Sequence, residues 1–178
     1  MAPEPRLATL EDLPAIRALI PLSVRALSTG HYSPGQIDAS LRHVFGADTQ
    51  LVRDGTYYVI EDDDGLLACG GWSRRRTLYG GDQLKQTEDP VLDPATEAAR
   101  IRAFFVHPRA ARRGLGRRLL ETCTAAARAA GFGALELGAT LPGVALYQAF
   151  GFAAVEQIEQ PMPGGLALPI VRMRLTLT

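Results

Sequence analysis

Apolar residues recur along the chain with two different spacings, and each spacing predicts its own kind of element. Apolar residues three and four positions apart, as in residues 13–20 and 115–127, predict helices with one buried face. Alternation with polar residues, as in residues 170–177, predicts a half-buried strand. The chain therefore mixes helices and strands, and their order indicates the fold class.

Start and stop signals place the elements of the N-terminal third. Residues 5–10 are expected to form a short strand, and Thr9 with Asp12 resembles a capping box at the start of the first helix. We expect Pro21 to kink or end that helix. In the segment 33–36, serine can cap a second helix, proline suits its first position and glutamine completes the box. The residues expected to be buried by this second helix are Ile37, Leu41 and either Val44 or Phe45.

The middle of the chain predicts a hairpin followed by a long loop. β-Forming residues in 56–61 and 66–79 flank an Asp-rich turn that ends at Gly65, which is typical of two antiparallel strands. Residues 80–96 contain glycine, proline and acidic residues without a regular period. Because loops of this length are uncommon in a compact domain and often functional, we interpret this one as a substrate lid or recognition loop.

The second half of the chain alternates strands and helices. Strand 101–106 precedes the helix that begins at residue 115, and strand 134–139 follows it, so these two strands are expected to pair in parallel. The remaining elements expected are a short helix and two strands, at residues 144–150, 152–158 and 170–177. The predicted fold class is α/β, with a mixed central sheet flanked by helices in a single domain spanning residues 1–178.

The turn between residues 106 and 118 is rich in glycine and arginine and leads directly from a strand into a helix. Gly114 and Gly116 have no side chains, so backbone N–H groups at the helix start can approach a ligand closely. These N–H groups and the positive end of the helix dipole favour an anion such as a phosphate or pyrophosphate. An isolated Gly-x-Gly is more often an ordinary turn, so this interpretation needs a second motif.

Composition excludes several classes of partner. Lysine and arginine together number 19, the same as aspartate and glutamate, so the chain has no overall charge to attract nucleic acid or an acidic membrane. Cys69 and Cys123 lie in apolar runs and are expected to be buried as free thiols. We predict no metal site. The N-terminus lacks a signal-peptide pattern, and we expect a cytoplasmic protein.

Two motifs in the second half resemble those of the GCN5-related N-acetyltransferase (GNAT) superfamily. The family's cofactor motif, Arg/Gln-x-x-Gly-x-Gly/Ala, is similar to residues 111–116, with both glycines present and Ala111 at the first position. The family's Leu-Tyr-x-x-x-Gly-Phe segment is matched by residues 146–152. The order of elements is also similar over nearly the whole chain. Two motifs at the expected separation favour this family over a chance match.

The resemblance implies that acetyl-CoA binds where strands 101–106 and 134–139 separate. Its pantetheine would pair with the first of these strands, and its pyrophosphate would meet the N–H groups and arginine side chains at the helix start. The cofactor-binding residues implied are Phe104, Phe105, Val106, Arg112, Arg113, Gly114, Leu115, Gly116, Arg117 and Tyr147. Arg109 could add a further phosphate contact.

The resemblance also implies direct attack of a substrate amine on the thioester in a ternary complex. Tyr147 would donate a proton to the departing thiolate, because a phenol with an ordinary pKa near ~10 stays protonated at neutral pH. A strand N–H near Phe105 would polarise the thioester carbonyl. Arg100 stands where some family members carry a glutamate, which leaves the base open. The candidates for the base are Glu97, Glu136, loop acids such as Glu88 and Asp93, and a water relay.

The acceptor is expected to be a small-molecule amine, and the acidic loop favours a cationic one or a basic peptide terminus. Trp72 and Tyr79 could line the acceptor site or simply pack on the hairpin. His31 and Tyr32 could shape the same site or lie in a surface loop.

The sequence also leaves open two other functions and a homodimer. A non-catalytic sensor that binds acyl-CoA without turnover is the first alternative. A nicotinamide oxidoreductase is the second, and it is disfavoured because Leu119 occupies the third glycine position of a dinucleotide fingerprint. Strand 170–177 could pair or pack across a homodimer interface.

Overall fold

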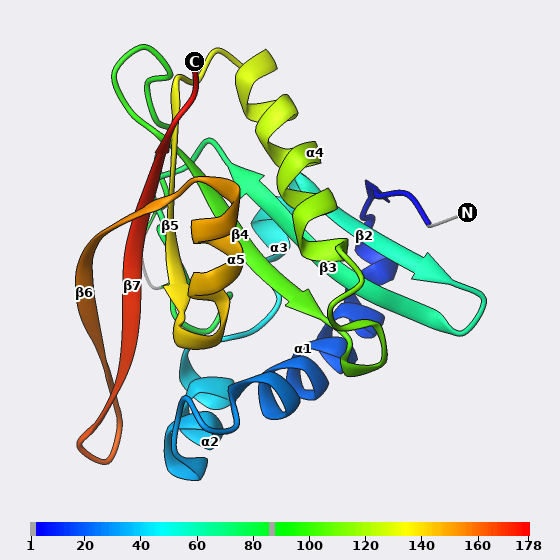
Figure 1. The fold of residues 1–178 in the computed structure, drawn as a ribbon, viewed down its shortest axis with the longest axis vertical. Coiled ribbons are helices and arrows are strands. Elements are labelled where there is room, and N and C mark those ends of the chain that lie inside the picture. Colours follow the sequence, from blue (N-terminus) through cyan, green and yellow to red (C-terminus); the bar gives the residue numbers. More distant parts are fainter. Residues whose placement is uncertain (1–2, 86–87) are drawn as a thin grey trace.

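The computed structural model describes residues 3–85 and 88–178 and contains a mixed sheet of seven strands (Figure 1). The strand order is β1-β2-β3-β4-β5-β7-β6. Strands β4 and β5 pair in parallel, and the other neighbours pair antiparallel. The strands are β1 (Arg6–Leu7), β2 (Tyr57–Asp62), β3 (Gly65–Ser73), β4 (Ala99–Val106), β5 (Ala134–Thr140), β6 (Ala153–Met162) and β7 (Leu166–Thr176). The predicted fold class is confirmed.

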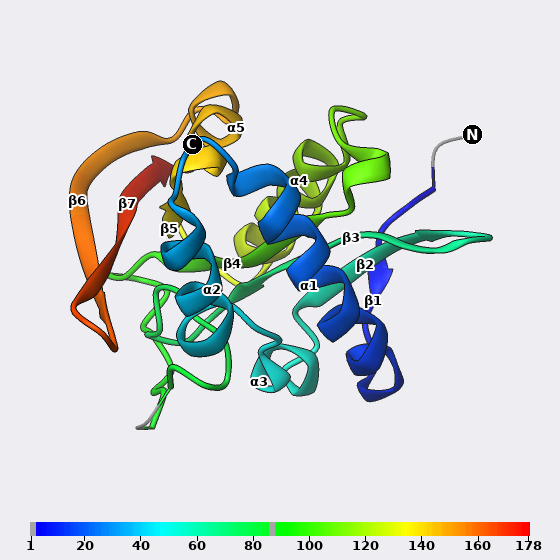
Figure 2. The same cartoon turned by 90° about the horizontal axis from the view of Figure 1, so that it is seen from below.

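Helices cover both faces of this sheet (Figure 2). The helices are α1 (Leu13–Ser28), α2 (Pro34–His43), α3 (Thr49–Arg53), α4 (Leu115–Ala129) and α5 (Val144–Phe150). Helices α1, α2 and α3 lie on one face, and α4 and α5 lie on the other. A buried apolar cluster fills each interface, with Ile16 and Leu51 in the first and Leu120 and Leu135 in the second. Within the described ranges, no helix has both the length and the apolar character needed to cross a membrane.

The strongest start and stop signals of the sequence act as predicted. The Gln36 N–H donates to the Ser33 hydroxyl at 3.1 Å, and the Ser33 N–H donates to the Gln36 side chain at 2.9 Å, which completes the capping box of α2. Gly151 ends α5 with φ of 120°, a left-handed conformation that favours glycine. Cys69 and Cys123 are buried free thiols, also as predicted.

Pro21 does not end the first helix, because α1 runs through the proline to Ser28, whereas the predicted kink stays a prediction. Proline removes one backbone hydrogen bond, but Ser23 and Val24 continue the buried face of the helix beyond it. Tertiary packing of that face outweighs the lost bond.

Strand β3 is shorter than the sequence pattern predicts, and helix α3 is an element that the pattern did not predict. Strand β3 ends at Ser73 instead of residue 79, and the Ser73 hydroxyl accepts a hydrogen bond from the Arg75 N–H at 2.9 Å as the chain turns. Helix α3 is too short to show a period, and it is capped by Asp48, whose carboxylate accepts from the Gln50 N–H at 3.1 Å.

Candidate active site

The two parallel strands β4 and β5 separate soon after they begin. They pair only at Ala99 with Leu135 and at Arg100 with Glu136, whereas β5 continues to pair with β7 along its whole length. Beyond Arg100, the backbone groups of β4 that face β5 therefore have no strand partner there. The predicted gap between the two strands is present.

A bulge in β4 lies beside this gap. Cys69 of β3 is opposite Phe105, and Gly71 is opposite Arg102, so that two residues of β4 face the single residue between them. Ala103 in the bulge has φ of 56°, and its carbonyl accepts a hydrogen bond from the buried Tyr57 hydroxyl at 2.6 Å. Tyr57 therefore fixes the strained backbone of the bulge.

The turn before α4 has the open backbone that an anion site needs. Arg112 and Gly114 have φ of 62° and 77°, and Gly114 is the N-cap of α4. A Cβ atom on Gly116 would lie 2.8 Å from the Leu146 side chain of α5. Gly114 thus allows the left-handed backbone of the turn. Gly116 lets α4 and α5 pack closely, which brings the glycine motif and the Leu-Tyr-x-x-x-Gly-Phe segment together in space.

The arginines of this turn have different partners. Arg109 donates to both carboxylate oxygens of Asp62 at 2.9 Å, so it ties the turn to the hairpin and is not a free phosphate ligand. Arg118 donates to the Pro3 carbonyl at 2.8 Å. The guanidiniums of Arg112, Arg113 and Arg117 are exposed at the start of α4. Arg117 lies 5.4 Å from the Phe150 ring centre and forms an exposed ion pair with Glu121 at 3.3 Å.

A first cavity, which we call the cofactor-side cavity, opens between α1, the end of β4 and the start of α5. It brings together five of the ten predicted cofactor residues, namely Phe104, Phe105, Val106, Gly116 and Tyr147. Its other lining residues are Ser23, Val24, Leu27, Ser28, His31, Phe45, Thr140, Pro142, Gly143 and Leu146. The remaining predicted residues, Arg112, Arg113, Gly114, Leu115 and Arg117, do not line it; they adjoin it along the chain, and the Leu115 side chain is buried in the core.

Ser23 is a cofactor-side residue that the sequence did not indicate. Its hydroxyl accepts a hydrogen bond from the Val106 N–H at 3.1 Å, and its side chain is buried. The Val106 N–H is one of the strand groups expected to pair with pantetheine. A buried serine on the apolar face of α1 is the signal that could have suggested this contact.

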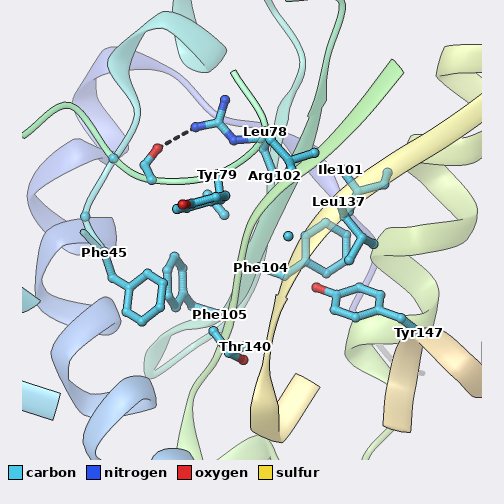
Figure 3. Close-up of a pocket in the computed structure, with 15 residues that line it drawn as sticks. Phe45, Leu78, Tyr79, Ile101, Arg102, Phe104, Phe105, Leu137, Thr140 and Tyr147 are labelled. Atoms are coloured by element: carbon cyan, nitrogen blue, oxygen red, sulfur yellow. Dashed lines mark hydrogen bonds between the residues drawn. The ribbon is translucent and has the colours of Figure 1, made fainter. Parts of the chain in front are cut away.

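A second cavity, the acceptor-side cavity, lies on the far side of Tyr147 (Figure 3). It is lined by Phe45, Gly46, Leu78, Tyr79, Gly80, Gly81, Ile101, Arg102, Ala103, Phe104, Phe105, Leu137, Gly138, Thr140 and Tyr147. The residues shared with the cofactor-side cavity are Phe45, Phe104, Phe105, Thr140 and Tyr147. The two cavities therefore meet at one wall, and Tyr147 is part of it.

The environment of Tyr147 suits a proton donor. The ring is 9% exposed and packs against Phe104 and Phe152, with ring centres 6.3 and 5.9 Å away. Burial raises the pKa of the phenol above its ordinary value, so the hydroxyl stays protonated. The hydroxyl points toward Phe104 in Figure 3.

Glu136 and Glu97 do not line either cavity. The Glu136 carboxylate forms ion pairs with Arg172 at 2.6 Å, Arg100 at 3.0 Å and Arg174 at 3.5 Å, which commits it to bridging three strands. Glu97 accepts from the Asp93 N–H at 3.0 Å. The structure therefore does not bring either predicted base to Tyr147.

The acidic residues of loop 80–96 stabilise the loop itself. Asp82 accepts from the Thr49 N–H at 3.0 Å, and Asp89 accepts from the Thr77 N–H at 2.8 Å. Asp93 likewise accepts from the Ala95 N–H at 3.0 Å. Gln86 and Thr87 of this loop lie outside the described residues. The described acids are thus not arranged as an anionic wall around the acceptor-side cavity.

The start of the same loop is a fixed wall of the site. The Gly81 N–H donates to the Val44 carbonyl at 2.8 Å, and the Gln83 side chain donates to the Phe45 carbonyl at 2.7 Å. Both bonds hold the loop against the α2–α3 connection. This part of the loop forms a wall of the acceptor-side cavity, and the predicted role of the loop as a lid stays a prediction.

The aromatic residues that the sequence left open have separate roles. Tyr79 lines the acceptor-side cavity, whereas Trp72 is buried against Phe132 with ring centres 6.1 Å apart. His31 lines the cofactor-side cavity. The Tyr32 hydroxyl donates to the Pro169 carbonyl at 2.6 Å, so Tyr32 links the first helices to β7.

Comparisons with known proteins identify a family and proteins of similar fold. The family model of the acetyltransferase (GNAT) domain matches residues 53–154. A GCN5-related N-acetyltransferase from Rhodopseudomonas palustris has 16% identity over 99% of this chain and 97% of its own, with a TM-score of 0.71. The PaiA N-acetyltransferase of Thermoplasma acidophilum, in complex with coenzyme A, has 14% identity over 99% of each chain and a TM-score of 0.66.

A structure of YncA from Salmonella typhimurium with acetyl-CoA has 19% identity over 100% of this chain and 95% of its own, with a TM-score of 0.64. No curated protein sequence matches the chain significantly. The structural likeness at these identities concerns the fold, and the family match rests on the domain model.

Proposed function

Because this chain belongs to the GNAT acetyltransferase family, we propose that it transfers the acetyl group of acetyl-CoA to a primary amine of a small molecule by direct attack in a ternary complex. The observation that carries this proposal is the meeting of two cavities at Tyr147. One cavity adjoins the open turn before α4, and the other is walled by side chains from distant parts of the chain. A donor and an acceptor can therefore approach the same point from opposite sides.

The residues of the cofactor side fit acetyl-CoA. The left-handed turn at Gly114 leaves backbone N–H groups at the start of α4 open to a pyrophosphate, with Arg112, Arg113 and Arg117 exposed beside them. The edge of β4 from Phe104 to Val106 can take an extended pantetheine as an added strand. Acetyl-CoA supplies an activated acyl group, and these residues bind and orient it.

Tyr147 is the proposed acid of the reaction. When the amine attacks the carbonyl carbon, the C–S bond breaks and the thiolate takes up a proton, which the phenol of Tyr147 can donate. Its raised pKa keeps that proton available throughout the neutral range. The phenolate that remains regains a proton from the amine or from water.

We propose that the amine gives its proton to water. Carboxylate side chains are not among the described residues that line the acceptor-side cavity. The aromatic wall instead favours the neutral form of an amine, because burial in an apolar site disfavours the charged form. A protein base in direct contact with the amine is therefore not needed.

A small acceptor suits the closed outer wall of this cavity. The Tyr79 hydroxyl donates to the Gln160 side chain and so connects the loop before β4 to the edge strand β6. A long peptide that followed this route would have to break that bond. This contact supports a small molecule over a peptide terminus.

The proposal can be tested with binding and turnover measured separately. A ligand at one hundred times its Kd stabilises the fold by about 2.7 kcal/mol, so melting temperatures with CoA, acetyl-CoA and NAD(P) should rise only for the CoA compounds. Release of the CoA thiol in the presence of amines should then follow. Stabilisation by NAD(P) alone would contradict the proposal, and stabilisation by acetyl-CoA without thiol release would favour the sensor alternative.

A further inference from the structure

The acceptor-side cavity is walled mainly by rings. Phe45, Tyr79 and Phe105 lie together on one side, and Phe104 and Tyr147 lie on the other (Figure 3). Phe45 and Phe105 meet edge to face with ring centres 6.4 Å apart. Rings in such positions favour a flat apolar guest, which can stack on one ring and meet the edge of another.

Charge in the same cavity disfavours a guest with several positive charges. Among the described lining residues Arg102 alone is charged, and it is 2% exposed. Asp48 pairs with Arg102 at 2.8 Å and with Lys85 at 2.7 Å, so its negative charge is already shared between two cations. A second ammonium group in this cavity would lose its water without gaining a carboxylate partner.

Tyr79 sets the width of the cavity over β5. A Cβ atom on Gly138 would lie 2.9 Å from the Tyr79 ring and 3.1 Å from the Ile170 side chain. The hydrogen bond to Gln160 holds the tyrosine in that place. The space next to Tyr147 is therefore a narrow slot whose outer limit is the Tyr79 ring.

We propose that the acceptor is a primary amine with a single positive charge in solution, whose amino group is joined by a short chain to a flat, apolar group such as an aryl ring. This inference rests on the proposed transfer to a small amine and names its substrate class. The ring of the acceptor would occupy the slot between Tyr79, Phe105 and Phe104, with its amine directed to Tyr147. The surplus acid of loop 80–96 plays no part in recognition, because Asp82, Asp89 and Asp93 accept backbone hydrogen bonds and the exposed Glu88 does not line the acceptor-side cavity.

An amine panel with the full-length protein tests this class directly. The rate of CoA thiol release would be measured with acetyl-CoA and 2-phenylethylamine, butylamine, spermidine or kanamycin. We expect kcat/KM for 2-phenylethylamine to exceed that of each other amine by about 10-fold or more, the discrimination that an apolar pocket ordinarily provides. Equal values, or a preference for spermidine or kanamycin, would overturn the inference and leave the proposed acetyl transfer intact.

Two variants of Tyr79 sharpen the test. Tyr79→Ala should open the slot, and the ratio of kcat/KM for 2-(1-naphthyl)ethylamine over 2-phenylethylamine should rise by about 10-fold. Tyr79→Phe keeps the ring and removes only the bond to Gln160, so this ratio should change far less. An unchanged ratio in Tyr79→Ala would overturn the role of the slot.

The melting-temperature shift with acetyl-CoA serves as a check that each variant is folded and binds its donor. If acetyl-CoA stabilises the protein and no amine of the panel releases thiol, the proposed transfer fails, and the substrate class fails with it. A changed order of preference among the amines, by contrast, would overturn only the proposed substrate class and would leave the proposed acetyl transfer intact.

Discussion

The two cavities that meet at Tyr147 are built in different ways. The proposed pyrophosphate site beside the cofactor-side cavity depends on one continuous turn, in which Gly114 supplies a left-handed backbone and Gly116 allows close packing of α5. The acceptor side depends on side chains from the α2–α3 connection, a loop, β4, β5 and α5. A site made of backbone groups leaves a local signature in the sequence. A site made of side chains exists only once distant segments have packed.

This difference predicts that the acceptor side relies more on buried tertiary contacts. The Asp48 side chain is fully buried beside Arg102, and removing one partner of such a pair costs about 3–5 kcal/mol. Asp48→Ala should therefore lower the free energy of unfolding by about that amount in urea titrations. Asp38→Ala, which removes an exposed ion pair with Arg25, should cost at most about 1 kcal/mol. Equal losses of unfolding free energy in Asp48→Ala and Asp38→Ala would show that the wall of the acceptor-side cavity does not depend on the buried ion pair of Asp48 and Arg102.

Tyr147 joins the two sides, so its hydroxyl should affect catalysis and leave binding nearly intact. Tyr147→Phe is expected to lower kcat by about 10²-fold or more, the ordinary contribution of a positioned acid. The melting-temperature shift with acetyl-CoA should be preserved. Tyr58→Phe is a matched control, because Tyr58 is a half-buried tyrosine that lines neither cavity. An unchanged kcat in Tyr147→Phe would exclude the hydroxyl as the proton donor.

Ser23 tests whether the edge of β4 binds the donor. Ser23→Ala leaves the Val106 N–H without its partner and should destabilise the free protein by about 1 kcal/mol. A pantetheine carbonyl would accept from that N–H, so acetyl-CoA should raise the melting temperature more in Ser23→Ala than in the unchanged protein. Ser40→Ala removes a buried serine bonded to the Ile37 carbonyl outside the site, and its shift with acetyl-CoA should be normal. A smaller shift in Ser23→Ala would contradict pairing along β4.

The smallest effect on stability is expected from breaking the ion pair of Arg6 and Asp12, neither of which lines a cavity. The Arg6 guanidinium lowers the pKa of the Asp12 carboxyl to about 2. Since an unfolded aspartate titrates near ~3.9, this pair stabilises the fold above that pH and loses its effect as pH falls toward about 2. Asp12→Asn should lower the melting temperature slightly at pH 7, and the difference from the unchanged protein should shrink as the pH falls to 2. Activity at pH 7 should not change. A difference in melting temperature as large at pH 2 as at pH 7 would contradict the ionic origin.

The elements around the cofactor-side cavity could be predicted from the sequence because their signals are local. The turn glycines, the Leu-Tyr-x-x-x-Gly-Phe segment and the cap at Ser33 each lie within a few residues of the structure they specify. The parallel pairing of β4 and β5 follows from the order of elements. Local signals and element order therefore account for most of the fold.

The acceptor side could not be predicted in the same way, because its polar residues have partners far away in the sequence. Arg102 is paired with Asp48, and Glu136 is enclosed by arginines from β4 and β7. Before folding, such an acid cannot be distinguished from a free catalytic base. The same holds for Asp82, whose carboxylate accepts a hydrogen bond from the Thr49 N–H at the start of α3 and does not line the acceptor-side cavity.

The central claim is that donor and acceptor meet at Tyr147, and a crystal structure of the protein with CoA tests it most directly. We predict that the pyrophosphate lies at the start of α4, that pantetheine runs along β4 toward Phe104, and that the sulfur is in hydrogen-bonding contact with the Tyr147 hydroxyl. A sulfur atom out of contact with Tyr147, or a CoA molecule bound away from the gap between β4 and β5, would contradict the account.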